Sequence, residues 1–187
     1  MKHLLLASSL LLSSTVFAAD WTPAFRYLET GKSGDGGAML GAIMDNTFSK
    51  AIYDYDDGKL PKQPLTKMAA SGKFTAIKAP YRNDMLPAKS YYGKDDLLLT
   101  AVYPLKNAKL YGYPLENLTY YLGCTECGHV GFYATFKPMT NAQYNALIKS
   151  VKFKQETEGD GCWGIGEPLA NFTRQGNVTQ LHLTMGC

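Results

Sequence analysis

The chain has 187 residues, with 19 Lys and Arg against 16 Asp and Glu, which gives a formal charge of +3. This small excess is carried by basic residues scattered along the sequence. A nucleic-acid-binding surface needs concentrated positive charge, so no nucleic acid partner is expected. Downstream of residues 1–19 no stretch is long and apolar enough to span a bilayer, so no stable membrane insertion is expected either.

The first residues have the pattern of a secretory signal peptide. Lys2 precedes an apolar run from Leu4 to Leu12, and small or β-branched residues follow at Val16, Ala18 and Ala19. The apolar run is shorter than the roughly 20 residues that a membrane-spanning helix needs. We expect cleavage after Ala18 or Ala19, and a periplasmic or secreted mature protein.

Residues 1–19 are thus predicted to be the signal peptide and residues 20–187 a single domain, because about 170 residues suit one hydrophobic core. The N-terminal part of this domain is predicted to be helical. Thr22 followed by Pro23 is typical of a capping residue and the first position of a helix. Apolar residues within 39–44 recur at helical spacing and predict a helix that faces the core.

From residue 97 onward the pattern predicts strands. Residues 97–103 are apolar on both faces, which is typical of an interior strand. Two further strand-like runs, 110–115 and 118–122, follow at short intervals, and in 130–136 the apolar residues Val130, Phe132, Ala134 and Phe136 alternate with period two. The last two runs flank a short turn, so we expect them to form an antiparallel pair.

A helix and a hairpin are predicted to end the chain. Thr140 and Gln143 form a capping box before an apolar helix face. Two strand-like runs, 169–174 and 178–185, flank a turn at 175–177 that contains Gly and Asn. The order of helices, strand meander, helix and hairpin predicts an α+β fold: a mainly antiparallel sheet with two or three packed helices, in a single disulfide-stabilised domain.

The four cysteines predict two disulfides, since their number is even and the chain is expected to be exported. The hairpin turn lies near the midpoint of Cys162 and Cys187, which favours that pair and leaves Cys124 with Cys127. Two alternatives remain for the local pair: a metal site that includes His129, or a thioredoxin-like redox site. The first lacks a second ligand pair at zinc-finger spacing, and the second needs a helix where the pattern predicts a strand. We therefore expect structural disulfides, and neither a metal nor a cofactor.

Catalytic patterns are sparse. Downstream of residue 19 the chain has two histidines, His129 and His182, and it has neither a Gly-x-Ser-x-Gly elbow nor a His-Glu-x-x-His motif. A nucleophile built from Cys127 and His129 would require a free thiol. His182 alternates with Leu181 and Leu183, so it is expected on the surface of a strand.

The predicted strand, cystine-closed loop and returning strand resemble periplasmic lysozyme inhibitors of the Ivy type. In that family the loop is longer and carries a histidine between its cysteines. Here only Thr125 and Glu126 lie between the cysteines, and His129 lies outside them. The resemblance covers a small part of the chain and implies no role for any residue.

These observations favour an exported, non-catalytic binding protein with a protein partner, such as an inhibitor of, or an immunity factor against, an envelope-targeting enzyme. Exposed tyrosines offer large contact area at low ordering cost. The rival hypotheses are an exported thiol oxidoreductase or hydrolase that uses Cys124, Cys127 or His129, and a structural envelope protein. The residues predicted to contact the partner are Thr125, Glu126, His129, Tyr133 and Tyr121.

Overall fold

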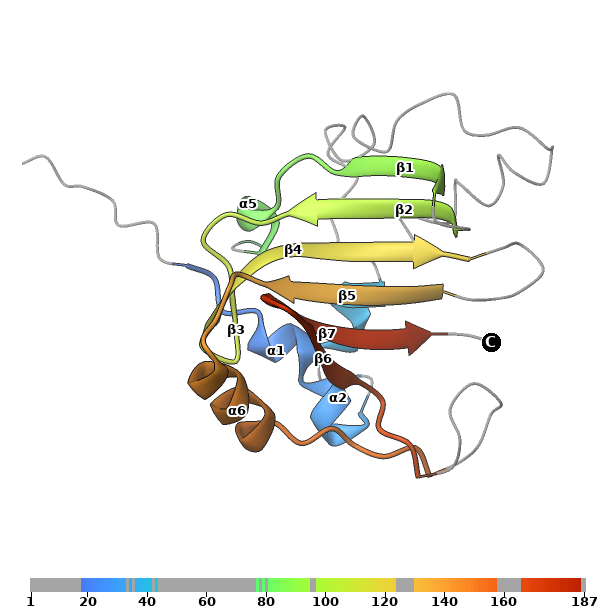
Figure 1. The fold of residues 1–187 in the computed structure, drawn as a ribbon. Coiled ribbons are helices and arrows are strands. Elements are labelled where there is room, and N and C mark those ends of the chain that lie inside the picture. Colours follow the sequence, from blue (N-terminus) through green and yellow to red (C-terminus); the bar gives the residue numbers. More distant parts are fainter. Residues whose placement is uncertain are drawn as a thin grey trace, which may run out of the picture.

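The computed structural model describes residues 18–32, 34, 36–41, 43, 77, 79, 81–94, 97–123, 130–157 and 166–185. Its helices are α1 (Thr22–Phe25), α2 (Tyr27–Thr30), α5 (Tyr81–Asp84) and α6 (Asn141–Ser150). Its strands are β1 (Lys89–Lys94), β2 (Leu97–Pro104), β3 (Lys109–Leu110), β4 (Tyr113–Leu122), β5 (Val130–Phe136), β6 (Asn171–Gln175) and β7 (Val178–Met185). The strands pair antiparallel in the order β1-β2-β4-β5-β7-β6, and β3 pairs with β4 (Figure 1). The predicted α+β fold with a mainly antiparallel sheet is confirmed.

The helices α1, α2 and α5 are short, with four residues each. Thr22 does not cap α1; the helix begins at Thr22, after Trp21, without a side-chain cap. The Thr22 hydroxyl instead accepts a hydrogen bond of 2.8 Å from the backbone N–H of Tyr111, which joins α1 to the turn between β3 and β4. Leu40 and Ile43 are buried in a helical segment, as their spacing predicted.

Strand β4 unites part of the 110–115 run with the 118–122 run, which the sequence suggested as separate strands. Its register against β5 shifts between Leu115 and Asn117, so Glu116 is the additional residue of a β-bulge. The bulge explains why Leu115 and Leu118 are both fully buried although three positions separate them. A strict alternation would have put one of these two side chains on each face.

The two predicted hairpin pairings are confirmed. Strands β4 and β5 pair antiparallel up to Leu122 and Val130, at the two ends of the predicted turn. Strands β6 and β7 pair up to Gln175 and Val178, which leaves a two-residue loop. Gly176 opens that loop with φ of 58°, a conformation that glycine adopts at little cost.

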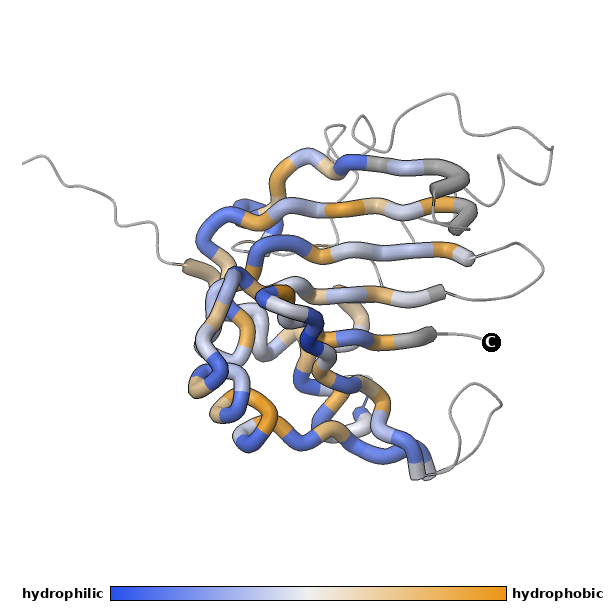
Figure 2. Tube along the Cα trace, viewed as in Figure 1, coloured by the Kyte–Doolittle hydropathy of each residue, from blue (hydrophilic) through white to orange (hydrophobic). Residues whose placement is uncertain are grey.

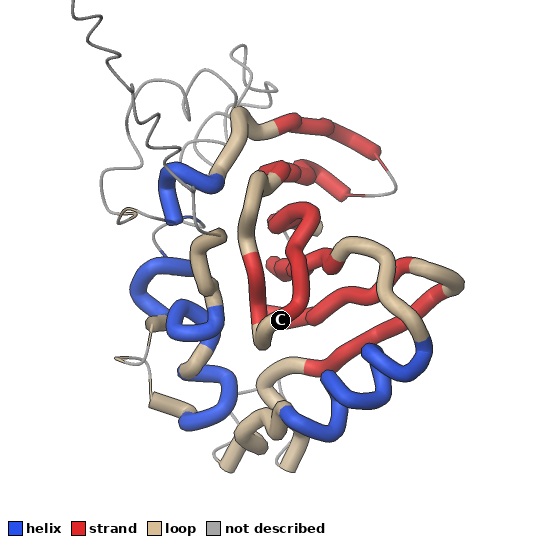
Figure 3. The backbone as a smooth tube through the Cα atoms, turned by 90° about the vertical axis from the view of Figure 1, so that its left-hand side faces the viewer, coloured by secondary structure: helices blue, strands red, loops and turns tan. Residues whose placement is uncertain are grey.

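The helices α1 and α2 lie on one face of the sheet, which we call the inner face (Figure 3). The Phe25 ring of α1 lies 5.4 Å from the Phe132 ring of β5, centroid to centroid. On β6, Phe172 continues the core toward Phe153, with centroids 5.1 Å apart. Apolar and polar segments succeed one another along the strands (Figure 2), as expected when one face packs on a core and the other does not. The opposite side is called the outer face.

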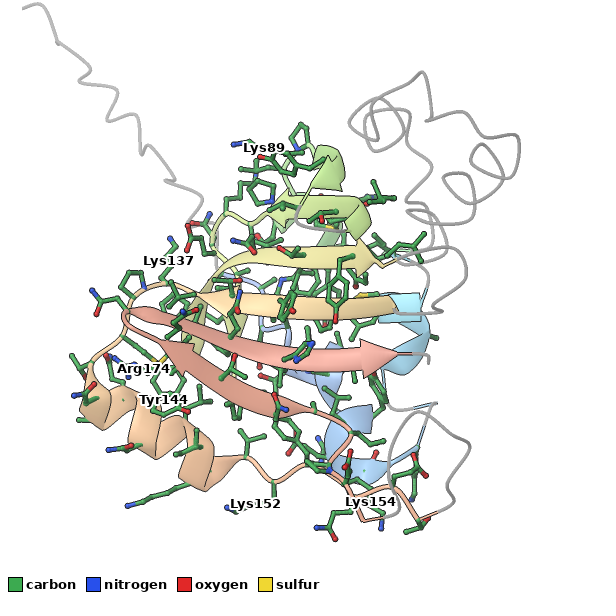
Figure 4. The ribbon with its side chains drawn as sticks, turned by 45° about the vertical axis from the view of Figure 1, so that its right-hand side comes forward. Lys89, Lys137, Tyr144, Lys152, Lys154 and Arg174 are labelled. Atoms are coloured by element: carbon green, nitrogen blue, oxygen red, sulfur yellow. The ribbon has the colours of Figure 1, made fainter. Side chains whose placement is uncertain are left out.

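Helix α6 is fixed at both its start and its side. The predicted capping box is present: the Thr140 hydroxyl accepts from the Gln143 backbone N–H, and the Gln143 side chain accepts from the Thr140 backbone N–H. Arg174 of β6 donates from Nη2 to the Met139 carbonyl at 3.0 Å, and its guanidinium lies 5.1 Å from the Tyr144 ring centre (Figure 4). In the described ranges, no helix has the length and apolar character needed to cross a membrane.

Candidate functional site

Three rings from three neighbouring strands stack on the outer face of the sheet. They belong to Tyr121 of β4, Tyr133 of β5 and His182 of β7, which we call the aromatic triad. The Tyr133 and His182 centroids lie 4.5 Å apart with planes 20° from parallel, and the Tyr121 and Tyr133 centroids lie 5.2 Å apart at 26°. The triad is therefore a continuous stack of half-buried rings.

A glycine makes this stack geometrically compatible with the sheet. Tyr121 is paired with Gly131 across β4 and β5, whereas Tyr133 is paired with His182 across β5 and β7. The Tyr121 phenol lies over Gly131, where a Cβ atom would overlap the ring. From there its hydroxyl reaches His182 Nε2 at 3.1 Å, across the width of β5. Because Gly131 has no side chain, the Tyr121 ring can occupy the space above it.

Among the described residues, the cross-strand neighbours of the triad on the adjoining strands are polar and uncharged. Thr100 is paired with Tyr121, Thr119 with Tyr133, and Asn171 with His182. These side chains offer hydrogen-bond donors and acceptors without net charge. The surface can therefore combine ring contacts with neutral hydrogen bonds.

Burial favours the neutral form of His182. Desolvation lowers the pKa of His182 below its ordinary value, which disfavours the imidazolium form. A carboxylate that oriented a catalytic imidazole would shift the pKa in the opposite direction. In its neutral form the imidazole shares a hydrogen bond with the Tyr121 hydroxyl.

The structure brings together two of the residues predicted for the site, Tyr121 and Tyr133. The other three, Thr125, Glu126 and His129, lie outside the described residues. So do the four cysteines, Cys124, Cys127, Cys162 and Cys187, so their predicted pairing stays a prediction. The predicted division into residues 1–19 and 20–187 likewise stays a prediction.

The sequence reading missed His182 and Gly131 as members of the site. Alternation correctly placed His182 opposite Leu181 and Leu183, which are both buried. What it lacked was the pairing of β5 with β7, which are separated in sequence by α6 and β6. Without that pairing nothing in the sequence set His182 beside Tyr133.

In the described part of the chain, the charged side chains form no comparable cluster. Lys89, Lys137, Lys152, Lys154 and Arg174 lie apart from one another around the periphery (Figure 4). Over the same residues, no group of three or more His, Cys, Asp or Glu side chains is arranged to hold a metal ion.

Comparison of the chain with protein-family models, with curated proteins and with solved structures gives no match.

Proposed function

We propose that this chain is an exported, non-catalytic binding protein that recognises a protein partner through the aromatic triad and through residues 124–129, for which the sequence predicts a turn. The observation that carries this proposal is the stack of Tyr121, Tyr133 and His182 across three strands. A stack held by the sheet is already ordered, so little side-chain entropy is lost when a partner contacts it.

The chemistry of the triad favours recognition over catalysis. Its members are two phenols and an imidazole whose lowered pKa keeps it neutral at neutral pH. A phenol at its ordinary pKa is a weak nucleophile at neutral pH. Tyrosine is, by contrast, one of the side chains that contribute most to protein interfaces.

A protein is the partner that this surface suits best. Tyrosines beside Thr and Asn are the composition of adaptable protein-binding surfaces, where rings supply contact area and small polar groups supply hydrogen bonds. Among the described residues, the uncharged cross-strand neighbours of the triad and the dispersed lysines form no concentrated positive charge that would attract a polyanion. Together with the export signal that the sequence predicts, this composition supports an inhibitor of, or an immunity factor against, an enzyme that attacks the cell envelope.

The test is binding to the partner, measured by calorimetry after the partner has been identified by crosslinking and purified. Tyr133→Ala should weaken binding by at least tenfold, since an interface tyrosine at the centre of a contact contributes more than about 1.4 kcal/mol. Tyr144→Ala, which removes a half-buried tyrosine from α6, is the matched control and should bind as wild type does. Denaturant unfolding of both variants shows that each is folded under the binding conditions.

Two results would contradict the proposal. One is equal binding by wild type and Tyr133→Ala. The other is evidence of a different function: turnover of a thiol or cell-wall substrate, or binding to purified envelope polysaccharide in place of protein.

A further inference from the structure

Of the charged side chains that the structure describes, Asp84 at the end of α5 is the buried one, with 2 % of its surface exposed. Its Oδ2 accepts hydrogen bonds from the backbone nitrogen of Ala19 at 3.2 Å and from Trp21 Nε1 at 3.5 Å. Burial raises the pKa of Asp84, against the opposing effects of these two hydrogen bonds and of the charge of Lys106. While Ala19 is part of an uninterrupted chain, these interactions therefore offset only part of the free-energy cost of burying the charged Asp84 carboxylate.

Ala19 is integrated into the fold. Its side chain is buried, and its carbonyl accepts a hydrogen bond of 2.9 Å from the Lys109 backbone N–H of β3. Two residues on, the Trp21 N–H donates to the Lys109 carbonyl at 2.7 Å, and the Trp21 indole is fully buried against Tyr81 of α5. Loss of Ala19 would remove the acceptor of the Lys109 N–H and would leave the Asp84 carboxylate with only the longer of its two hydrogen bonds, the one from Trp21 Nε1.

The sequence left two cleavage positions open, after Ala18 and after Ala19, and these have opposite consequences. Cleavage after Ala19 removes the residue that contacts Asp84 and Lys109. Cleavage after Ala18 keeps those contacts and converts the Ala19 nitrogen, 3.2 Å from the carboxylate, into a primary amine. A countercharge for a buried carboxylate is then created by the processing reaction itself.

We propose that Ala19 is the mature N-terminus and that its α-ammonium forms a buried ion pair with Asp84 once the signal peptide is removed. The proposal rests on the proposed export. The step is hydrolysis: water adds across the Ala18–Ala19 peptide bond, Ala18 leaves as a carboxylate, and the released Ala19 amine takes up a proton. The mature domain thereby gains an interaction that the precursor lacks.

The cleavage position is tested by secreting the full chain from a Gram-negative host and determining the N-terminal sequence and intact mass. The expected N-terminus is Ala19-Asp20-Trp21. A protein that begins at Asp20 would overturn the inference and leave export standing. A protein that keeps its first residues and stays in the cytoplasm would overturn the export premise as well.

The ion pair is tested by comparing two oxidised, folded forms, one that begins at Ala19 and one with a single added Gly before it. The added residue keeps the Ala19 N–H as a donor and moves the ammonium away by up to about 3.8 Å. At pH 7 the Ala19 form should melt several degrees higher, and Asp84→Asn should lower its melting temperature more than that of the Gly-extended form. Equal melting temperatures of the two wild-type forms would overturn the ion pair even if Asp84→Asn failed to fold.

The pH dependence separates the ion pair from a packing effect. A carboxylate partner raises the pKa of the amine above its ordinary value of about 7.7–8.0, so the added stability is complete below that range and is lost as pH rises through the folded-state pKa. The other groups near the pair are Asp20, Lys106 and Tyr81, and burial together with Asp20 raises the pKa of Tyr81 above its ordinary 10. The difference between the two forms should therefore shrink from pH 8 upward. A constant difference up to pH 10 would contradict the ion pair.

Discussion

Replacing Gly131 with alanine is expected to destabilise the protein, although alanine in a strand is ordinarily the better residue. Removing a glycine from a strand interior stabilises by about 0.5–1 kcal/mol when the site has room for a methyl group. Here the new Cβ would overlap the Tyr121 ring, so the phenol must leave its place over β5. Its displacement removes the stack on Tyr133 and the hydrogen bond to His182.

The expected magnitude follows from these contacts. An aromatic pair contributes about 0.5–1.5 kcal/mol beyond its buried area, and a hydrogen bond a similar amount. Against the gain from removing glycine, the net loss for Gly131→Ala is about 1–2 kcal/mol. In a domain of this size that corresponds to a fall of about 2–8 °C in melting temperature.

The assay is urea unfolding of wild type, Gly131→Ala, Tyr121→Ala and the double variant. Because Tyr121→Ala removes the ring that causes the overlap, Gly131→Ala should become neutral or stabilising in that background. This reversal of sign is the signature of a direct steric coupling between the two residues. If Gly131→Ala stabilises wild type, or destabilises both backgrounds equally, the claim that Gly131 makes room for the Tyr121 ring is refuted.

Three further outcomes are expected. Because burial lowers the pKa of His182, the stability that its neutral form contributes is complete above the ordinary pKa of about 6.5 and is lost as pH falls through the folded-state pKa. The urea midpoint of wild type should therefore fall between pH 7.5 and pH 5, and His182→Gln should make this fall smaller. An unchanged pH dependence in the variant would refute this prediction. Arg174→Lys should lower the free energy of unfolding by about 1–2 kcal/mol, because lysine keeps the charge but cannot both donate to the Met139 carbonyl and lie flat on the Tyr144 ring. A urea midpoint equal to that of wild type would argue against these contacts. Thr140→Ala should cost about 1 kcal/mol through loss of the capping box and Thr140→Ser much less, so equal losses would count against the cap.

Local patterns predicted the elements of this fold well. The capping box of Thr140 and Gln143 and the Gly176 turn both depend on side chains within a few residues of one another, and both are present. The bulge at Glu116 was not predicted, because the extra residue breaks the alternation that defines a strand in sequence. The two runs that it separates therefore looked like two strands.

The candidate site was only half predictable. Tyr121 and Tyr133 could be named from a hairpin whose strands are neighbours in sequence. His182 joins them through the pairing of β5 with β7, which is a tertiary contact across more than 40 residues. The burial of Asp84 against Ala19 is likewise a long-range contact, since the two residues are 65 positions apart in the sequence. No local sequence pattern could have predicted either of these two contacts.

The most direct test of the proposed recognition surface is photo-crosslinking at residue 133 in cells that make the protein. A benzophenone amino acid replaces Tyr133 in one variant and Tyr144 of α6 in the other, and the crosslinked products are identified by mass spectrometry. The proposal predicts one discrete protein adduct from position 133 that position 144 does not give. The same products from both positions, or none from position 133 in a protein shown to be folded, would contradict it.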